Sequence, residues 1–164
     1  MRRFVNPGNT AFEVAVNSQI YVDKTGLLAY TNSVINTKQA LICSSRPRRF
    51  GKSITADMLC AYYSRGCDSD SIFASYEIAK SDYYKKHLNQ YDVIYLDIQW
   101  CMMDAGSAEQ TVSYLNYHVI EELKEIYPQI LPDGIRTAYG AMSCINAQTG
   151  VKFIVIIDEW DVLI

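Results

Sequence analysis

The chain has 164 residues, 49% of them hydrophobic, with a net charge of −3 at pH 7 and a predicted isoelectric point near 5.3. This length and apolar content predict one domain with a sizeable buried core. The acidic balance argues against a dedicated nucleic-acid surface, and because the sequence has no signal-peptide pattern and no apolar run of about 18 residues, we expect a cytoplasmic protein with no membrane partner.

The first half of the chain is expected to alternate apolar strands and helices. The apolar segment 20–22 leads into a helix expected over 24–35. The short apolar run 40–43 is typical of a parallel-sheet strand buried on both faces. A second helix is expected after Ser53, because apolar residues recur there at helical spacing until Gly66 supplies a stop.

The second half contains further predicted helices. A short one is expected over 80–88. Ser107 and Gln110 form a capping box that opens a longer helix, and an apolar stripe runs along this helix through 112–126. A turn at 132–134 opens the last predicted helix.

The loop before the second helix carries the most chemical information, because it closes on Gly51-Lys52-Ser53. In a phosphate-binding P-loop (the Walker A motif), backbone N–H groups and the helix dipole face the anion, the lysine bridges the outer phosphates, and the next hydroxyl ligates Mg²⁺. The motif is incomplete, because the general pattern has glycine where this chain has Arg46. The residues that we expect to bind the nucleotide are Arg46, Pro47, Arg48, Arg49, Phe50, Gly51, Lys52, Ser53 and Ile54.

The arginines of this loop allow two interpretations. Guanidinium groups suit bidentate contact with phosphate, so the cluster would neutralise the nucleotide. Alternatively, only Lys52 touches the nucleotide while Arg48 and Arg49 pair with acids elsewhere in the fold. Pro47 is expected to stiffen a loop that lacks its first glycine.

Two apolar segments, 91–97 and 153–157, are predicted as strands of one parallel sheet, the second buried on both faces. The second strand leads into Asp158 and Glu159. In P-loop ATPases an acid at this strand end (the Walker B motif) holds the Mg²⁺ shell, and a following glutamate activates water. We therefore expect Asp158 to be a metal ligand and Glu159 to be catalytic. The alternatives are a core strand that merely ends at the surface, and Asp97 as a rival metal ligand without a second acid beside it.

Four segments carry a family resemblance: YVDKT at 21–25, SRPRRFGKS at 45–53, VIYLD at 93–97 and IDEWD at 157–161. Together they resemble the AAA-ATPase-like family of bacterial and archaeal P-loop ATPases. The resemblance spans nearly the whole chain, and RPRRFGKS is its most specific part. Members of that family tolerate arginine at the position of Arg46.

The resemblance implies an α/β fold, a P-loop NTPase of the additional-strand (AAA-like) class with a parallel sheet and helices on both faces. It implies that Asp23 and Lys24 lie near the base of the nucleotide, although such residues more often cap a helix. Family members often carry a PD-(D/E)XK-nuclease-like domain after the ATPase. The implied partner is therefore a fused or separate nuclease-like effector, whereas a nucleic-acid partner is not indicated by the net charge.

The same resemblance predicts that residues 1–164 are the N-terminal part of one AAA-ATPase-like domain, truncated after the Walker B strand. The arginine-finger and sensor residues, and a strand next to the P-loop strand, would follow Ile164. A sheet without a central strand leaves buried N–H and C=O groups unpaired, each costing about 1–3 kcal/mol. We therefore expect the isolated polypeptide to be weakly stable or to depend on another chain.

The function we expect is Mg²⁺-dependent ATP binding and, in the full-length protein, ATP hydrolysis. Lys52 would stabilise charge on the transferred phosphoryl group, Ser53 and Asp158 would hold Mg²⁺, and Glu159 would polarise water. Two alternatives stay open: an ATP-binding switch or scaffold without significant turnover, and a P-loop kinase of a small molecule. The adjacent acids favour hydrolysis over kinase chemistry, and the sequence has no N-K-x-D motif typical of GTPases.

Overall fold

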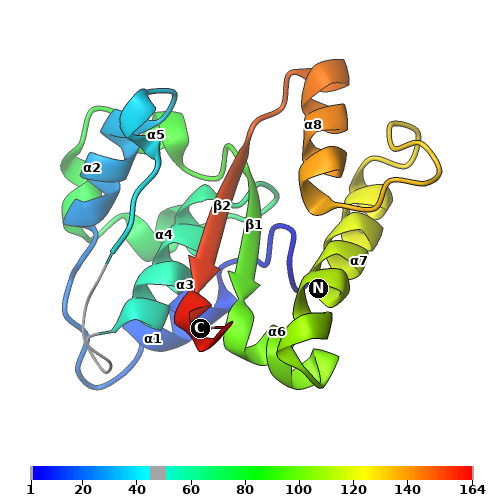
Figure 1. Ribbon diagram of the computed structural model, residues 1–164. Coiled ribbons are helices and arrows are strands. Elements are labelled where there is room, and N and C mark those ends of the chain that lie inside the picture. Colours follow the sequence, from blue (N-terminus) through cyan, green and yellow to red (C-terminus); the bar gives the residue numbers. More distant parts are fainter. Residues whose placement is uncertain (1, 45–50, 164) are drawn as a thin grey trace. The chain divides into compact units, whose positions relative to one another are not determined.

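The structure is a computed structural model that describes residues 2–44 and 51–163. The chain divides into two units, and we describe each by itself (Figure 1). The helical unit consists of Gly8–Gln90, and the sheet unit consists of Met1–Pro7 together with Tyr91–Ile164. The described residues form a mixed α/β structure with a small parallel sheet, which confirms the coarse fold class.

The helical unit consists of short helices held together by aromatic side chains. Phe12 stacks on Phe73 with ring centroids 5.1 Å apart, and Tyr62 meets Phe73 edge-on at 5.3 Å. Each aromatic side chain removes about 150–250 Å² from water when buried, so a few rings hold several short elements. The elements are α1 (Thr10–Val16), α2 (Gly26–Val34), the 3₁₀ turn η1 (Lys38–Ala40), α3 (Lys52–Tyr63), α4 (Asp70–Phe73), the 3₁₀ turn η2 (Glu77–Lys80) and α5 (Tyr84–His87).

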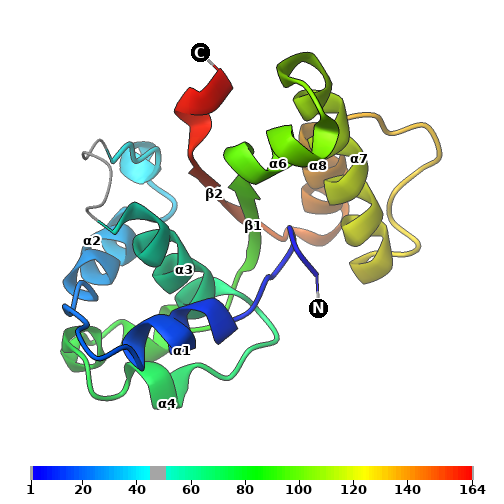
Figure 2. The same ribbon diagram turned by 90° about the horizontal axis from the view of Figure 1, so that it is seen from below.

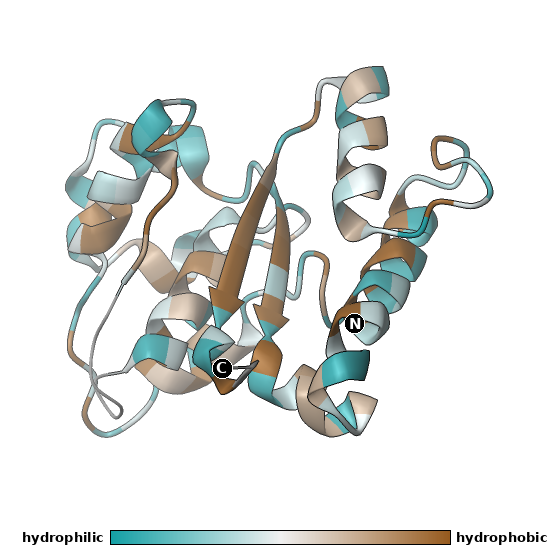
Figure 3. Cartoon of the chain, viewed as in Figure 1, coloured by the Kyte–Doolittle hydropathy of each residue, from teal (hydrophilic) through white to brown (hydrophobic). Residues whose placement is uncertain are grey.

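The sheet unit contains two parallel strands, β1 (Asp92–Asp97) and β2 (Phe153–Asp158), as the sequence predicted. Their register places Asp92 opposite Phe153 and Asp97 opposite Asp158, so both strands end at the same edge of the sheet. The apolar run of each strand shows in brown in Figure 3. The remaining elements are α6 (Ile98–Ala105), α7 (Ala108–Ile126), α8 (Ala138–Thr149) and the 3₁₀ turn η3 (Trp160–Leu163).

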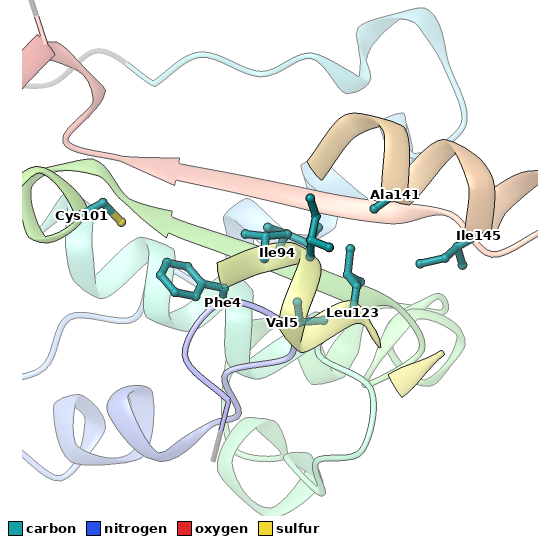
Figure 4. Close-up of a cluster of buried hydrophobic side chains, with 9 residues drawn as sticks. Phe4, Val5, Ile94, Cys101, Leu123, Ala141 and Ile145 are labelled. Atoms are coloured by element: carbon teal, nitrogen blue, oxygen red, sulfur yellow. The ribbon is translucent and has the colours of Figure 1, made fainter. Parts of the chain in front are cut away.

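The core of the sheet unit joins β1 to its three helices. Figure 4 shows Ile94 of β1 among Cys101 of α6, Leu123 of α7 and Ile145 of α8. α7 and α8 lie side by side in this unit (Figure 2). α7 is amphipathic. In the described part of the chain, no helix is long and apolar enough to cross a membrane.

The N-terminal segment is fixed to this core by one carboxylate. The side chain of Glu122 accepts hydrogen bonds from the backbone N–H groups of Arg3, Phe4 and Val5, at 2.8, 2.9 and 2.7 Å. Val5 also forms an isolated antiparallel bridge with Ile94. Because a carboxylate that accepts several N–H groups makes strong charge-assisted bonds, this contact explains why the first residues belong to the sheet unit.

The predicted helices form, with shifted ends. Ser107 caps α7 by accepting a hydrogen bond from the N–H of Gln110 at 3.4 Å, as the capping box predicted. The stripe on α7 begins later than predicted, because Val112 is exposed. The last helix begins at Ala138 rather than directly after the turn at 132–134, since the side chain of Thr137 supplies its N-cap. The helix predicted over 80–88 is shorter in the structure, where α5 occupies only Tyr84–His87.

The strand predicted at 40–43 is wrong for this structure. Residues 41–44 have no regular secondary structure, and the side chain of Leu41 is 95% exposed. A strand needs hydrogen bonds to a neighbour, and the described sheet consists of β1 and β2 alone. The predicted burial of 153–157 on both faces is wrong for the same reason, because Val155 and Ile157 remain exposed.

Candidate functional site

The predicted phosphate-binding segment opens α3. Gly51 adopts the left-handed conformation (φ 73°, ψ 36°) immediately before Lys52, the first residue of the helix. The carbonyl oxygen of Gly51 accepts hydrogen bonds from the backbone N–H and the hydroxyl of Thr55, at 3.1 and 2.9 Å. The first N–H groups of a helix have no partner within the helix, so this fixed end presents donors to an anion.

The side chains of the motif lie on the accessible side of this helix start. Lys52 is half-buried, whereas Ser53 and Ile54 are exposed. The opposite end of α3 is buried, with Tyr62 and Tyr63 in the core. α3 therefore holds Lys52 and Ser53 on a rigid support while leaving them accessible.

Hydrogen bonds lock the buried end of α3. The hydroxyl of Tyr63 donates to the side-chain carbonyl of Asn32 at 2.8 Å, and the amide of Asn32 donates to the hydroxyl of Tyr62 at 3.0 Å. The hydroxyl of Tyr62 in turn donates to the carbonyl of Tyr84 at 2.9 Å. Tyr62 and Tyr63 therefore belong to the core of the helical unit.

The segment 21–25 approaches the same helix start within the helical unit. A Cβ atom built on Gly51 would lie 2.7 Å from Nζ of Lys24. Asp23 holds this segment, because its carboxylate accepts hydrogen bonds from the N–H groups of Thr25 at 2.8 Å and Glu77 at 3.0 Å. Burial alone would raise the pKa of Asp23, but these N–H donors outweigh it and lower the pKa below its usual value.

Asp158 occupies the end of β2, where the sequence predicted the metal-binding acid. Its side chain is only 7% exposed. One carboxylate oxygen, Oδ1, accepts a hydrogen bond from the N–H of Glu159 at 3.0 Å, while Oδ2 is buried without a partner in the described part of the chain. A buried carboxylate oxygen without a partner costs free energy, so this oxygen is suited to be the ligand of a cation.

Glu159 follows in a strained backbone conformation. Its φ is +51°, in the left-handed region that non-glycine residues rarely adopt. Such conformations cost about 1–3 kcal/mol, and Asn6, Asn36 and Asn89 adopt them as well. Glu159 is the residue for which the sequence predicts water activation.

Asp97, the rival metal ligand, is the last residue of β1. Its carboxylate accepts a hydrogen bond from the N–H of Trp100 at 3.0 Å and caps α6. Asp97 and Asp158 lie opposite each other in the strand register, and of these two acids only Asp158 has a buried oxygen without a partner among the described residues. Asp97 also lines a hollow of about 310 Å³, together with Arg3, Phe4, Tyr95, Trp100 and Cys101.

The carboxylate of Asp158 fits Mg²⁺ as a ligand, because Mg²⁺ prefers oxygen ligands. Mg²⁺ is usually held by one or two carboxylates together with substrate phosphates and water, so a cluster of protein acids is not required. The described residues contain no cluster of three or more His, Cys, Asp or Glu side chains able to hold a metal. Within the described residues, the unpartnered oxygen of Asp158 is a carboxylate oxygen of the kind that Mg²⁺ takes as a ligand.

The described structure covers only part of the predicted site. Residues 46–50, which include Arg46, Pro47, Arg48, Arg49 and Phe50, lie outside the described residues. Gly51, Lys52, Ser53 and Ile54 belong to the helical unit, and Asp158 and Glu159 belong to the sheet unit. Sequence reasoning missed the role of Thr55 in fixing Gly51 and the position of Lys24 beside it.

A glycine-lysine-serine segment at a helix start and a buried acid at the end of a parallel strand are typical of nucleotide-binding α/β proteins. The chain belongs to the AAA-ATPase-like family: the family model described as "Predicted AAA-ATPase" matches residues 8–164. Comparisons with curated proteins and with solved structures gave no significant match. The family supports a general ATPase-like function.

Proposed function

We propose that the chain is a Mg²⁺-dependent ATP-binding module that hydrolyses ATP, with a P-loop fold of the additional-strand class. The observation that carries this proposal is the start of α3, where a left-handed Gly51 held by Thr55 precedes Lys52 and Ser53. An ATP triphosphate has the charge and the acceptors that match the lysine ammonium and the first N–H groups of the helix. Membership of a predicted AAA-ATPase family supports ATP as the ligand.

Each side chain has one assigned role. Lys52 binds the outer phosphates and stabilises the charge that develops on the transferred phosphoryl group. Ser53 and the unpartnered carboxylate oxygen of Asp158 would hold Mg²⁺, which when bound neutralises charge on the phosphates. Glu159 accepts a hydrogen bond from the attacking water and orients it. A nuclease-like effector, fused or separate, is the partner that the resemblance implies.

Phosphate release measured with ATP, GTP and no added acceptor tests this function. We expect release from ATP that requires Mg²⁺ and stops on addition of a chelator. Calorimetry on the same samples measures binding separately from turnover. Mg²⁺-dependent ATP binding without phosphate release would favour the switch or scaffold, whereas no binding of any nucleotide would contradict the proposal.

A further inference from the structure

Lys24 and Gly51 are distant in sequence but meet at the start of α3. The Nζ atom of Lys24 would lie 2.7 Å from a Cβ atom on Gly51, a separation that real Cβ atoms essentially never show. The ammonium therefore occupies the space that a side chain at position 51 would fill. It lies against the backbone immediately before Lys52, within the same unit.

The backbone on both sides of Lys24 is fixed. Asp23 accepts the N–H groups of Thr25 and Glu77, and the hydroxyl of the fully buried Thr25 accepts the N–H of Ile78 at 3.2 Å. The carbonyl of Lys24 itself accepts the N–H of Leu27 at 3.0 Å. Little backbone freedom is therefore lost when the ammonium of Lys24 binds a ligand at this position.

We propose that Lys24 is a second phosphate-binding lysine, which contacts the phosphate chain of the nucleotide held at the start of α3. This inference rests on the proposed ATP binding. An ammonium is a compact charge with three donors, and here it lies against Gly51, the residue that precedes Lys52 and the first N–H groups of α3. Lys24 thus acts on the phosphates rather than on the base-side wall that the resemblance implied.

A charge series at position 24 tests this role, with Lys86 as the matched control. Lys86 is an exposed lysine of the same unit, and its ammonium lies over the ring of Tyr83. Calorimetry with Mg-ATP should give an affinity about tenfold lower for K24M, a further loss for K24E, and near wild-type affinity for K24R. K86M and K86E should bind as wild type does.

The outcomes separate the two proposals. A wild-type protein that does not bind Mg-ATP overturns the proposed function and this inference with it. Wild-type binding that is unchanged in K24M, or equal losses in K24M and K24E, overturns the phosphate role of Lys24 alone. If circular dichroism shows that K24E does not fold, the salt dependence of K24M replaces it: loss of a phosphate contact makes the affinity less sensitive to NaCl than that of wild type, and an unchanged dependence contradicts the inference.

Discussion

Replacing Gly51 with alanine should separate backbone strain from loss of ligand binding. At φ +73° an alanine side chain is strained by about 1–2 kcal/mol, partly offset because alanine reduces the freedom of the unfolded chain. The net cost of about 1 kcal/mol corresponds to a melting temperature lower by about 2–4 °C. The new methyl group would also lie 2.7 Å from the ammonium of Lys24 and must displace it. We therefore expect ATP affinity to fall about tenfold or more.

Gly66 offers a matched control for this substitution. It has a similar positive φ of +85°, belongs to the same unit, and a Cβ built there meets none of the described residues within 4 Å. Thermal melting should show similar destabilisation of G51A and G66A, and calorimetry should show weaker ATP binding for G51A alone. Equal ATP affinity in the two variants would refute the argument that Gly51 and its surroundings contact the nucleotide.

Two further predictions concern the acids and the alkaline limit of stability. E159Q should keep ATP affinity while phosphate release falls by about 10²-fold, whereas D158N should weaken Mg²⁺-dependent binding; identical behaviour of the two variants would contradict their separate roles. Burial, with a smaller effect of Asp23, raises the pKa of Tyr21 from 10.0 to about 12, so the unfolded chain loses this proton first and stability should fall between these pH values. Because the Tyr21 side chain is partly exposed, we expect this loss of stability to be about 1 kcal/mol. Urea titrations at pH values from about 9 to 12 should show the loss in wild type and not in Y21F. A decline in stability that is equal in the two proteins would contradict this assignment.

Local patterns predicted the elements that depend on local interactions. The capping box at Ser107 and the stripe that follows it gave α7, because caps and helical periodicity act within a few residues. The two apolar runs ending in acids gave β1 and β2, which pair in parallel and place Asp97 opposite Asp158. The sequence could not decide between these two acids, because they differ in hydrogen bonding: Asp97 caps a helix, whereas one oxygen of Asp158 has no partner in the part of the chain that the structure describes.

Features that depend on distant partners could not be predicted. The apolar run 40–43 has the composition of a strand, but a strand forms only where a neighbouring strand supplies hydrogen bonds, and Leu41 is exposed here. The approach of Lys24 to Gly51 depends on the neighbouring Asp23, whose carboxylate accepts a hydrogen bond from the distant N–H of Glu77. Contacts of this kind follow from tertiary packing, which periodicity and motif spacing do not predict.

The most direct test of the central claim is Mg-ATP binding by K52A, compared with wild type and with K86A. Lys52 opens α3 and carries the positive charge assigned to the outer phosphates. Calorimetry should detect ATP binding by wild type and by K86A, and should detect none, or an affinity lower by about 100-fold, for K52A. Equal binding by K52A and wild type would contradict the claim that the start of α3 is a nucleotide-binding site.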